Sequence, residues 1–281
     1  MGVRIILDST ANFSKDLKDK FTVVPLTVNF GEESYADGVE IDNDTFYRKL
    51  VTGDVMPTTS QPTPAVFAQV FENIVNEGDE AVVITISSKL SGTYQSATIA
   101  AEDFAGKVFV VDGYTVAIGT GALAEYAMEL AEKGKTAAEI FEILENDKAD
   151  IRVYAVVDTL EYLKKGGRVS AAVAFAGGLL NFKPVIAIAD GVVQSLTKGR
   201  GNKQANSLMN QEIEKSGDID FTKPFVIGYT GSDSTLMQEY IKDNLDVWGG
   251  DKDKIHTAQL GSVVGTHAGP GAVAVGYFVK K

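Results

Sequence analysis

A cluster of hydroxyl side chains follows an apolar run in the first third of the chain and could bind an anion. The segment 87–97 reads SSKLSGTYQSA and joins a predicted buried strand at 81–86 to a predicted helix that begins near Ser91. The first turn of a helix presents unpaired N–H groups, and Gly92 would let a ligand approach the backbone closely. We therefore predict a phosphate or carboxylate site here. The alternative is that Ser91 and Thr93 only cap their helix.

Two further segments carry side chains that suit an anion. The loop 57–64, PTTSQPTP, places Thr59 and Ser60 between prolines that restrict the backbone and pre-organise these donors. The segment 261–271, GSVVGTHAGPG, places His267 in a predicted glycine-rich turn, where the backbone and not a core would hold the ring. Each segment also has a plain structural explanation, as a proline-rich connector and as a structural histidine.

Several enzymatic motifs are absent or misplaced. The glycines of 119–124 have the spacing of a dinucleotide fingerprint, but they lie inside a predicted helix and do not follow a strand. The chain has no Gly-x-Ser-x-Gly elbow, so Ser91 and His267 make a poor serine hydrolase although they are the right residue types. With two histidines and no cysteine, we predict no metal site. The second histidine, His256, lies on a predicted strand and is interpreted as structural.

The elements that must position these side chains alternate between strand and helix. Over 281 residues, this alternation predicts an α/β fold with two domains, 1–150 and 151–281. Each domain is expected to hold a mixed or mostly parallel sheet with flanking helices. The predicted strands cover 3–7, 22–30, 81–86, 107–111, 151–157, 185–189, 225–229 and 272–279.

The composition is typical of a soluble globular protein. The hydrophobic share is 44% and the charged share 23%, and the absence of cysteine fits a reducing cytoplasm. The longest apolar run, 171–180, is half the ~20 residues that a membrane span needs, and the N-terminus lacks a secretory apolar region. We expect a cytoplasmic protein that does not insert into a membrane, and transient membrane contact stays open.

The charge distribution excludes one class of partner and suggests another. A net charge of −12 argues against nucleic acid, whose binding depends on many contacts from cations to phosphates. The sign reverses locally at Lys198, Arg200 and Lys203, around a predicted glycine-bearing turn. These cations could steer an acidic partner or a nucleotide phosphate, or they could simply be solvated.

The segments described above resemble the DegV family when taken in order. Members of this family are fatty-acid-binding proteins with two α/β domains, and some serve as the acyl-carrying subunit of bacterial fatty acid kinase. The resemblance implies that the fatty acid lies between the domains and that Thr59, Ser91 and His267 hold its carboxylate. Ser60 and Gly92 would lie beside them. The matching segments are DST at 8–10, TSQP at 59–62, SSKLSGTY at 87–94, DTLEYLKKGGR at 158–168, KP at 183–184 and GTHAGPG at 265–271.

We therefore predict a protein that binds a long-chain fatty acid and presents its carboxylate to a separate fatty acid kinase subunit, which would form the acyl phosphate. Hydroxyls, helix N–H groups and one imidazole would hold the carboxylate without an arginine, so that it stays available to attack a phosphoryl donor. The fatty acid would be the ligand, with no cofactor and no catalytic activity of the subunit itself. Lys198, Arg200 and Lys203 would dock the kinase.

One further assignment concerns the acyl chain, and two rival functions stay open. Ala174, Phe175 and Ala176 belong to a run of small residues that is predicted to line the acyl tunnel, although a helix packed closely on the sheet explains the same run. The alternative function is a self-sufficient hydrolase or small-molecule kinase that uses Ser91 and His267. A third is a scaffold whose pocket is vestigial.

Overall fold

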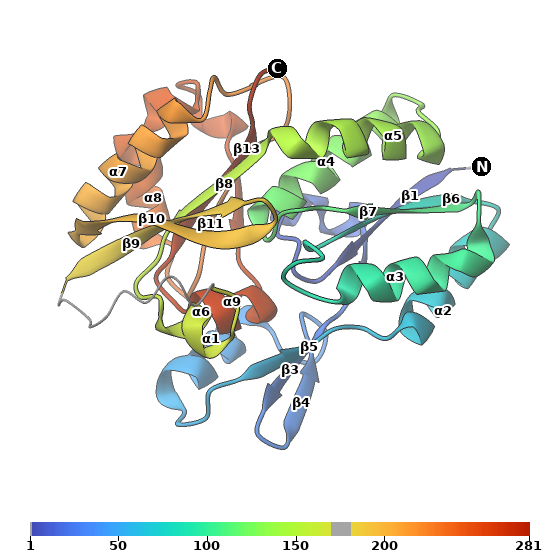
Figure 1. Ribbon diagram of the computed structural model, residues 1–281, viewed down its shortest axis with the longest axis horizontal. Coiled ribbons are helices and arrows are strands. Elements are labelled where there is room, and N and C mark those ends of the chain that lie inside the picture. Colours follow the sequence, from blue (N-terminus) through green and yellow to red (C-terminus); the bar gives the residue numbers. More distant parts are fainter. Residues whose placement is uncertain (1, 170–180) are drawn as a thin grey trace.

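A parallel four-stranded sheet forms one half of the molecule (Figure 1). The computed structural model describes residues 2–169 and 181–281. Within the sheet every pair of neighbours is parallel, in the order β2-β1-β6-β7. Both of its faces are covered, which explains the near-continuous apolar runs in the sequence. The strands are β1 (Val3–Asp8), β2 (Thr22–Val24), β6 (Glu80–Thr85) and β7 (Val108–Asp112).

Two pairs of helices cover this sheet. Side chains along β1 alternate between the two faces, with Ile6 in the core under α2 and α3 and with Ile5 and Leu7 in the core under α4 and α5. A capping box formed by Thr136 and Glu139 fixes the start of α5. The helices are α2 (Pro64–Asn76), α3 (Thr93–Ala101), α4 (Ile118–Glu132) and α5 (Ala137–Asp147).

A six-stranded mixed sheet forms the other half. Its strand order is β10-β9-β8-β13-β11-β12, and β11 and β12 are its one parallel pair. Helices α7 and α8 cover the outer face, while the inner face turns toward α4. The elements are β8 (Ile151–Val156), β9 (Phe182–Ala189), β10 (Val192–Arg200), α7 (Gly201–Lys215), β11 (Val226–Tyr229), α8 (Thr235–Asp243), β12 (His256–Gln259) and β13 (Val273–Phe278).

A small antiparallel sheet and three helices lie at the lower edge of Figure 1. The sheet has the order β4-β3-β5, and α9 packs against it and against α1 and α6. Its members are β3 (Thr27–Phe30), β4 (Glu33–Ala36), α1 (Asn43–Thr52), β5 (Thr58–Ser60), α6 (Glu161–Lys165) and α9 (Ser262–Ala268). Short 3-10 helices are η1 (Lys15–Lys20), η2 (Glu102–Phe104), η3 (Lys148–Asp150), η4 (Leu245–Trp248) and η5 (Lys252–Lys254).

The predicted α/β class is confirmed, with local differences. The expected strand at 22–30 is broken at Pro25, which cannot donate to a ladder, so that β2 joins the parallel sheet and β3 the small one. The strand β10 was not predicted, and its Lys198 and Arg200 lie in a ladder and not in a turn. The expected glycine-rich turn around His267 is the helix α9.

The predicted boundary at residue 150 separates the strands of the two large sheets but not their cores. Every strand of the parallel sheet precedes that residue, and every described strand of the six-stranded sheet follows it. One buried cluster nevertheless continues from β1 and β6 through α4 to β8 and β13. The division into two domains, 1–150 and 151–281, therefore stays a prediction.

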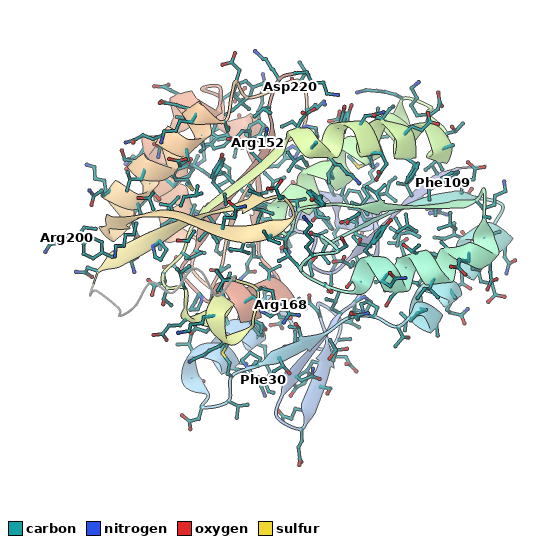
Figure 2. The ribbon with its side chains drawn as sticks, in the orientation of Figure 1. Phe30, Phe109, Arg152, Arg168, Arg200 and Asp220 are labelled. Carbon is teal, nitrogen blue, oxygen red and sulfur yellow. The ribbon has the colours of Figure 1, made fainter. Side chains whose placement is uncertain are left out.

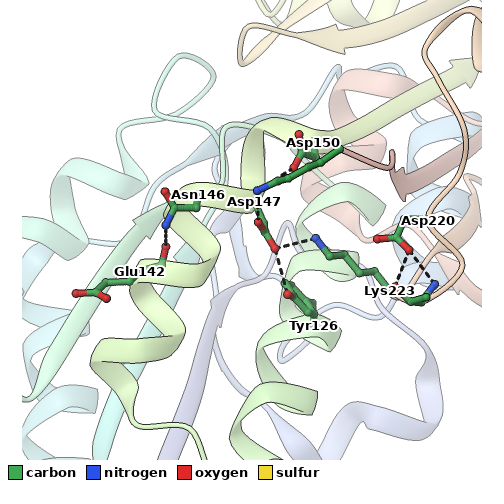
Figure 3. Close-up of polar contacts among 9 residues, drawn as sticks. Tyr126, Glu142, Asn146, Asp147, Asp150, Asp220 and Lys223 are labelled. Carbon is green, nitrogen blue, oxygen red and sulfur yellow. Dashed lines mark hydrogen bonds and ion pairs between the residues drawn. The ribbon is translucent and has the colours of Figure 1, made fainter.

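A polar network around Asp147 also joins the two halves (Figure 3). The Asp147 carboxylate accepts hydrogen bonds from Tyr126 at 3.1 Å, from Lys223 at 2.7 Å and from Lys281 at 2.8 Å. Burial disfavours the charged carboxylate, but the bonds from Lys223 and Lys281 outweigh it and lower the pKa of Asp147. The Lys223 ammonium also lies over the rings of Tyr126 and Phe278.

Candidate ligand-binding site

The carboxyl ends of β1 and β6 mark the point where ligands bind in many open parallel sheets. The chain leaves β1 toward β2 on one side and leaves β6 toward β7 on the other, so the topological switch point lies between β1 and β6. Asp8, at the end of β1, is fully buried and accepts a hydrogen bond from the backbone N–H of Ile86 at 2.7 Å. The same carboxylate accepts from the N–H and hydroxyl of Thr10. Asp8 therefore ties together the two loops that leave the switch point.

An aliphatic cavity lies between this edge and the inner face of the six-stranded sheet. Together with the open space at its mouth, it holds about 870 Å³ of empty volume. Val153, Ala155 and Val157 line it from β8 and the residue that follows, at alternate positions as the strand requires. Ile186 and Ile188 line it from β9. Such a lining suits a hydrocarbon chain.

Polar side chains in the lining gather from separate elements. Thr59 comes from β5, Ser91 from the loop after β6, and His267 from the last turn of α9. Thr59 Oγ1 and His267 Nε2 are 3.0 Å apart and hydrogen-bonded. Ser91 Oγ lies 2.8 Å from Thr93 Oγ1 and accepts from the Thr93 N–H at 3.3 Å. The three residues predicted to hold a carboxylate thus all line one cavity.

The imidazole of His267 is neutral at physiological pH. Burial, assisted by the positive charge of Arg168, lowers the pKa of His267 to about 4. Its Nδ1 is buried without a hydrogen-bond partner among the described residues. The ring is packed closely there, because a Cβ atom on Gly166 would lie 2.1 Å from Nδ1. His267 therefore contributes one donor and one acceptor, and no positive charge.

Arg168 is the residue of this site to which the sequence analysis assigned no role. It is the one charged side chain in the described lining of the cavity. Its Nε donates to the Leu90 carbonyl at 3.3 Å, and Nη1 donates to the Gly166 carbonyl at 2.6 Å. A guanidinium has five N–H groups, so donors remain for an anion. The expectation that hydroxyls, N–H groups and imidazole act without an arginine stays a prediction, and Arg168 lines the same cavity. The signal in the sequence was a cation directly after two glycines.

Ser60 and Gly92 lie near the site with other contacts. The hydroxyl of Ser60 accepts a hydrogen bond from Asn29 at 3.3 Å, because alternate side chains of β5 point to opposite faces. Gly92 packs against Gln61, whose amide donates to the Gly92 carbonyl at 3.1 Å, and a Cβ on Gly92 would lie 2.2 Å from Gln61 Oε1. Neither belongs to the described lining. Gly92 instead allows the two hydroxyl-bearing loops to approach each other.

The remaining predicted residues lie elsewhere or outside the described part of the chain. The predicted tunnel wall, Ala174, Phe175 and Ala176, falls on 170–180 and so lies outside the described residues. The helix expected to begin near Ser91 begins at Thr93, with Gly92 as its N-cap residue. Among the described residues, no helix is long and apolar enough to cross a membrane.

These features define a class: α/β proteins with an aliphatic cavity that meets hydroxyl, imidazole and guanidinium groups at a sheet switch point. The family model described as "Uncharacterised protein, DegV family" matches residues 2–280. A DegV domain-containing protein of Caldanaerobacter subterraneus subsp. tengcongensis is 35% identical over 286 residues, with 99% of each chain covered. The chain belongs to the DegV family, which confirms the resemblance found in the sequence.

Solved structures of the family have the same fold. The chain is similar to a Thermus thermophilus DegV protein described by its fatty acid binding, with a TM-score of 0.88, 34% identity, and 99% of this chain and 100% of that one covered. A stearic acid-binding protein from Eubacterium ventriosum has a TM-score of 0.88 and 30% identity, with 100% and 99% covered. DegV of Bacillus subtilis, described as a fatty acid binding protein, has a TM-score of 0.84 and 29% identity, with both chains fully covered.

Proposed function

We propose that this protein binds a long-chain fatty acid with its hydrocarbon tail in the aliphatic cavity and its carboxylate at Thr59, Ser91 and His267. The observation that carries the proposal is the cavity itself, whose lining is aliphatic except for a few convergent polar groups. The fatty acid binding of the Thermus, Eubacterium and Bacillus proteins supports it.

The hydrogen bonds among the polar lining residues indicate how a carboxylate would be held. A buried N–H without a partner is rarer than a buried lone pair, so we assign the proton of the His267 ring to Nε2. This Nε2–H then donates to Thr59 Oγ1, which leaves the hydroxyl hydrogen of Thr59 free for the ligand. Arg168 supplies the positive charge that the neutral imidazole lacks.

The same proposal includes a partner. We infer that the protein presents the carboxylate to a separate fatty acid kinase subunit, which transfers a phosphoryl group to form the acyl phosphate. In this role the protein holds and orients the nucleophile, and the partner supplies the phosphoryl donor. Its docking surface would be Lys198, Arg200 and Lys203, at the end of β10 and the start of α7. Figure 2 places Arg200 at the outer tip of the six-stranded sheet, where a partner can reach it.

A self-sufficient hydrolase or small-molecule kinase is the rival function. It needs Ser91 activated by His267, whereas Ser91 is bonded to Thr93 and His267 to Thr59. A nucleophile and its general base should share a hydrogen bond or lie within reach of one. These contacts favour a carboxylate site over a Ser–His dyad.

Native mass spectrometry of the purified protein tests the proposal. We expect a fraction of the molecules to carry one long-chain fatty acid that is released intact on denaturation. Protein with its lipid removed should regain the same mass increment when incubated with stearic acid. A protein that stays lipid-free under both conditions, or that converts an added acyl ester to free acid, would contradict it.

A further inference from the structure

The helix that carries His267 cannot fix its own position. Helix α9 has seven residues, and an isolated helix of that length is unstable because its first turn is costly to form. His267 lies in its last turn, so any tilt of α9 moves the ring away from Thr59. The orientation of the ring must therefore come from what holds the two ends of the helix.

A buried carboxylate holds the first end. Asp37, which follows β4 and is 4% exposed, accepts hydrogen bonds from the N–H and the hydroxyl of Ser262 at 3.2 and 2.5 Å. Asp37 thus satisfies the N–H of Ser262, the first residue of α9, as an N-cap side chain would, although it lies 225 residues away in the chain.

Two aromatic contacts hold the rest of α9. A Cβ on Gly265 would lie 2.6 Å from the hydroxyl of Tyr47, so the backbone of α9 rests directly on α1. Gly269, just past the end of the helix, packs in the same way against the ring of Tyr162 on α6. These contacts leave little room for sliding, and Asp37 adds directional bonds to Ser262 in the first turn of α9.

The small sheet β4-β3-β5 also positions Thr59, which bonds to His267. Thr59 lies on β5, where it pairs with Val28 of β3, and Asp37 follows β4, which pairs with the same β3. Asp37 donates its own backbone N–H to the Leu26 carbonyl at 2.9 Å, directly before β3. Thr59 and His267 are therefore both attached to the small sheet. Thr59 is attached by the pairing of β5 with β3, and His267 through the carboxylate of Asp37.

We propose that Asp37 is the positioning residue of the His267–Thr59 pair. It touches neither the cavity nor the ligand, and it acts by fixing the start of α9. The effect of Asp37 on the position of His267 can be measured in lipid-free protein, whereas its effect on fatty acid affinity rests on the proposed function.

The test uses the ring signals of the two histidines in NMR spectra of lipid-free protein, with Asp37→Ala and Asp37→Asn as variants. In Asp37→Ala we expect the signals of His267 to shift and those of His256 to stay, because the His256 ring is held by Glu125 of α4 and not by α9. Stearic acid affinity should fall about tenfold, as for the loss of one hydrogen bond to a charged group. In Asp37→Asn the side-chain oxygen can still accept from Ser262, so both readouts should return close to the wild type.

A matched control removes an equivalent bond elsewhere. Asp233 accepts from the N–H and hydroxyl of Thr235 at the start of α8, which does not line the described cavity. Asp233→Ala should leave the His267 signals and the affinity unchanged. If Asp37→Ala does not fold, Ser262→Ala, which removes the shorter bond alone, should give a smaller shift in the same direction. Unchanged His267 signals in folded Asp37→Ala, or in folded Ser262→Ala if Asp37→Ala does not fold, would overturn the proposal, whether or not the wild type binds stearic acid.

Discussion

At the polar end of the cavity, a neutral ring, two hydroxyls and one guanidinium come from four separate parts of the chain. Each has a structural partner among the described residues. Ser91 accepts from the N–H of Thr93, His267 bonds to Thr59, and Arg168 bonds to two carbonyls. Groups that are already held lose little further freedom when a ligand binds, so the site is pre-organised.

We predict that Ser91→Ala weakens fatty acid binding by about 1–3 kcal/mol, because one hydrogen bond to a charged group is lost, while the fold is kept. Calorimetric titration of lipid-free protein with a fatty acid measures this. Ser88→Ala is the matched control, since Ser88 is exposed on the same loop and outside the described lining. Equal affinities of the wild type and a folded Ser91→Ala variant would make Ser91 a structural residue only.

On the scale of elements, a hydrogen bond between Glu125 and His256 joins α4 to the edge strand β12. Glu125 is 1% exposed on α4 and accepts a hydrogen bond from the N–H of Ser14. Its other oxygen bonds to Nδ1 of His256, whose ring is partly exposed. This contact supports the structural interpretation of His256. The bond to Glu125 raises the pKa of His256 against the effect of burial, and the charges of Glu129 and Asp16 act in the same direction.

The pair makes stability depend on pH. A histidine whose pKa is raised on folding stabilises the fold fully below its unfolded pKa of about 6.5, and this contribution is lost as the pH rises through the folded value. We expect His256→Gln to destabilise the protein more at pH 6 than at pH 9. Urea unfolding of both proteins at the two pH values measures the difference. An equal loss at both pH values would show that His256 acts by packing and not by its charge.

Regular elements follow from the sequence, and short irregular ones do not. The strands β1, β6, β7, β8, β11 and β13 carry apolar runs that the parallel or central positions require, so pattern alone locates them. Helix α9 was read as a turn because of its glycines. Gly265 is there because Tyr47 leaves no room for a side chain, a long-range reason that no local pattern contains. β10 was missed since an edge strand with a bulge near Ser195 carries mostly polar residues.

In the candidate site, too, residue types could be predicted from the sequence, whereas features set by long-range contacts could not. Thr59, Ser91 and His267 were identified from residue type and from the family resemblance, and all three line the cavity. Arg168 was not assigned, because its approach depends on the glycine pair that precedes it and on the loop of Leu90. The side-chain direction of Ser60 depends on the strand register of β5, and the close approach of Gln61 at Gly92 depends on tertiary packing.

At the scale of the whole molecule, the proposed docking surface of Lys198, Arg200 and Lys203 can be tested directly. The net charge of −12 makes the cations at the end of β10 a local exception. We predict that Arg200→Ala keeps fatty acid affinity and stability but loses acyl phosphate formation in a coupled assay with the kinase. Added salt should slow association of the wild type.

The control for this prediction is Arg152→Ala, which removes an arginine of the same sheet whose bonds go to the carbonyls of Ala149 and Ile151. It should support acyl phosphate formation at the wild-type rate if it folds. Full activity of Arg200→Ala at limiting concentrations of this protein would show that Arg200 is not part of the docking surface.

The bond between Thr59 and His267 spans 208 residues of sequence, and that between Asp37 and Ser262 spans 225. Contacts of such separation form late, because the whole intervening chain must be ordered first. During synthesis, β5 leaves the ribosome long before α9 does. A nascent chain can therefore build the parallel sheet and expose its switch point while the polar end of the cavity is still incomplete. The hydrogen bond between Thr59 and His267 can therefore form only after α9 has been synthesised.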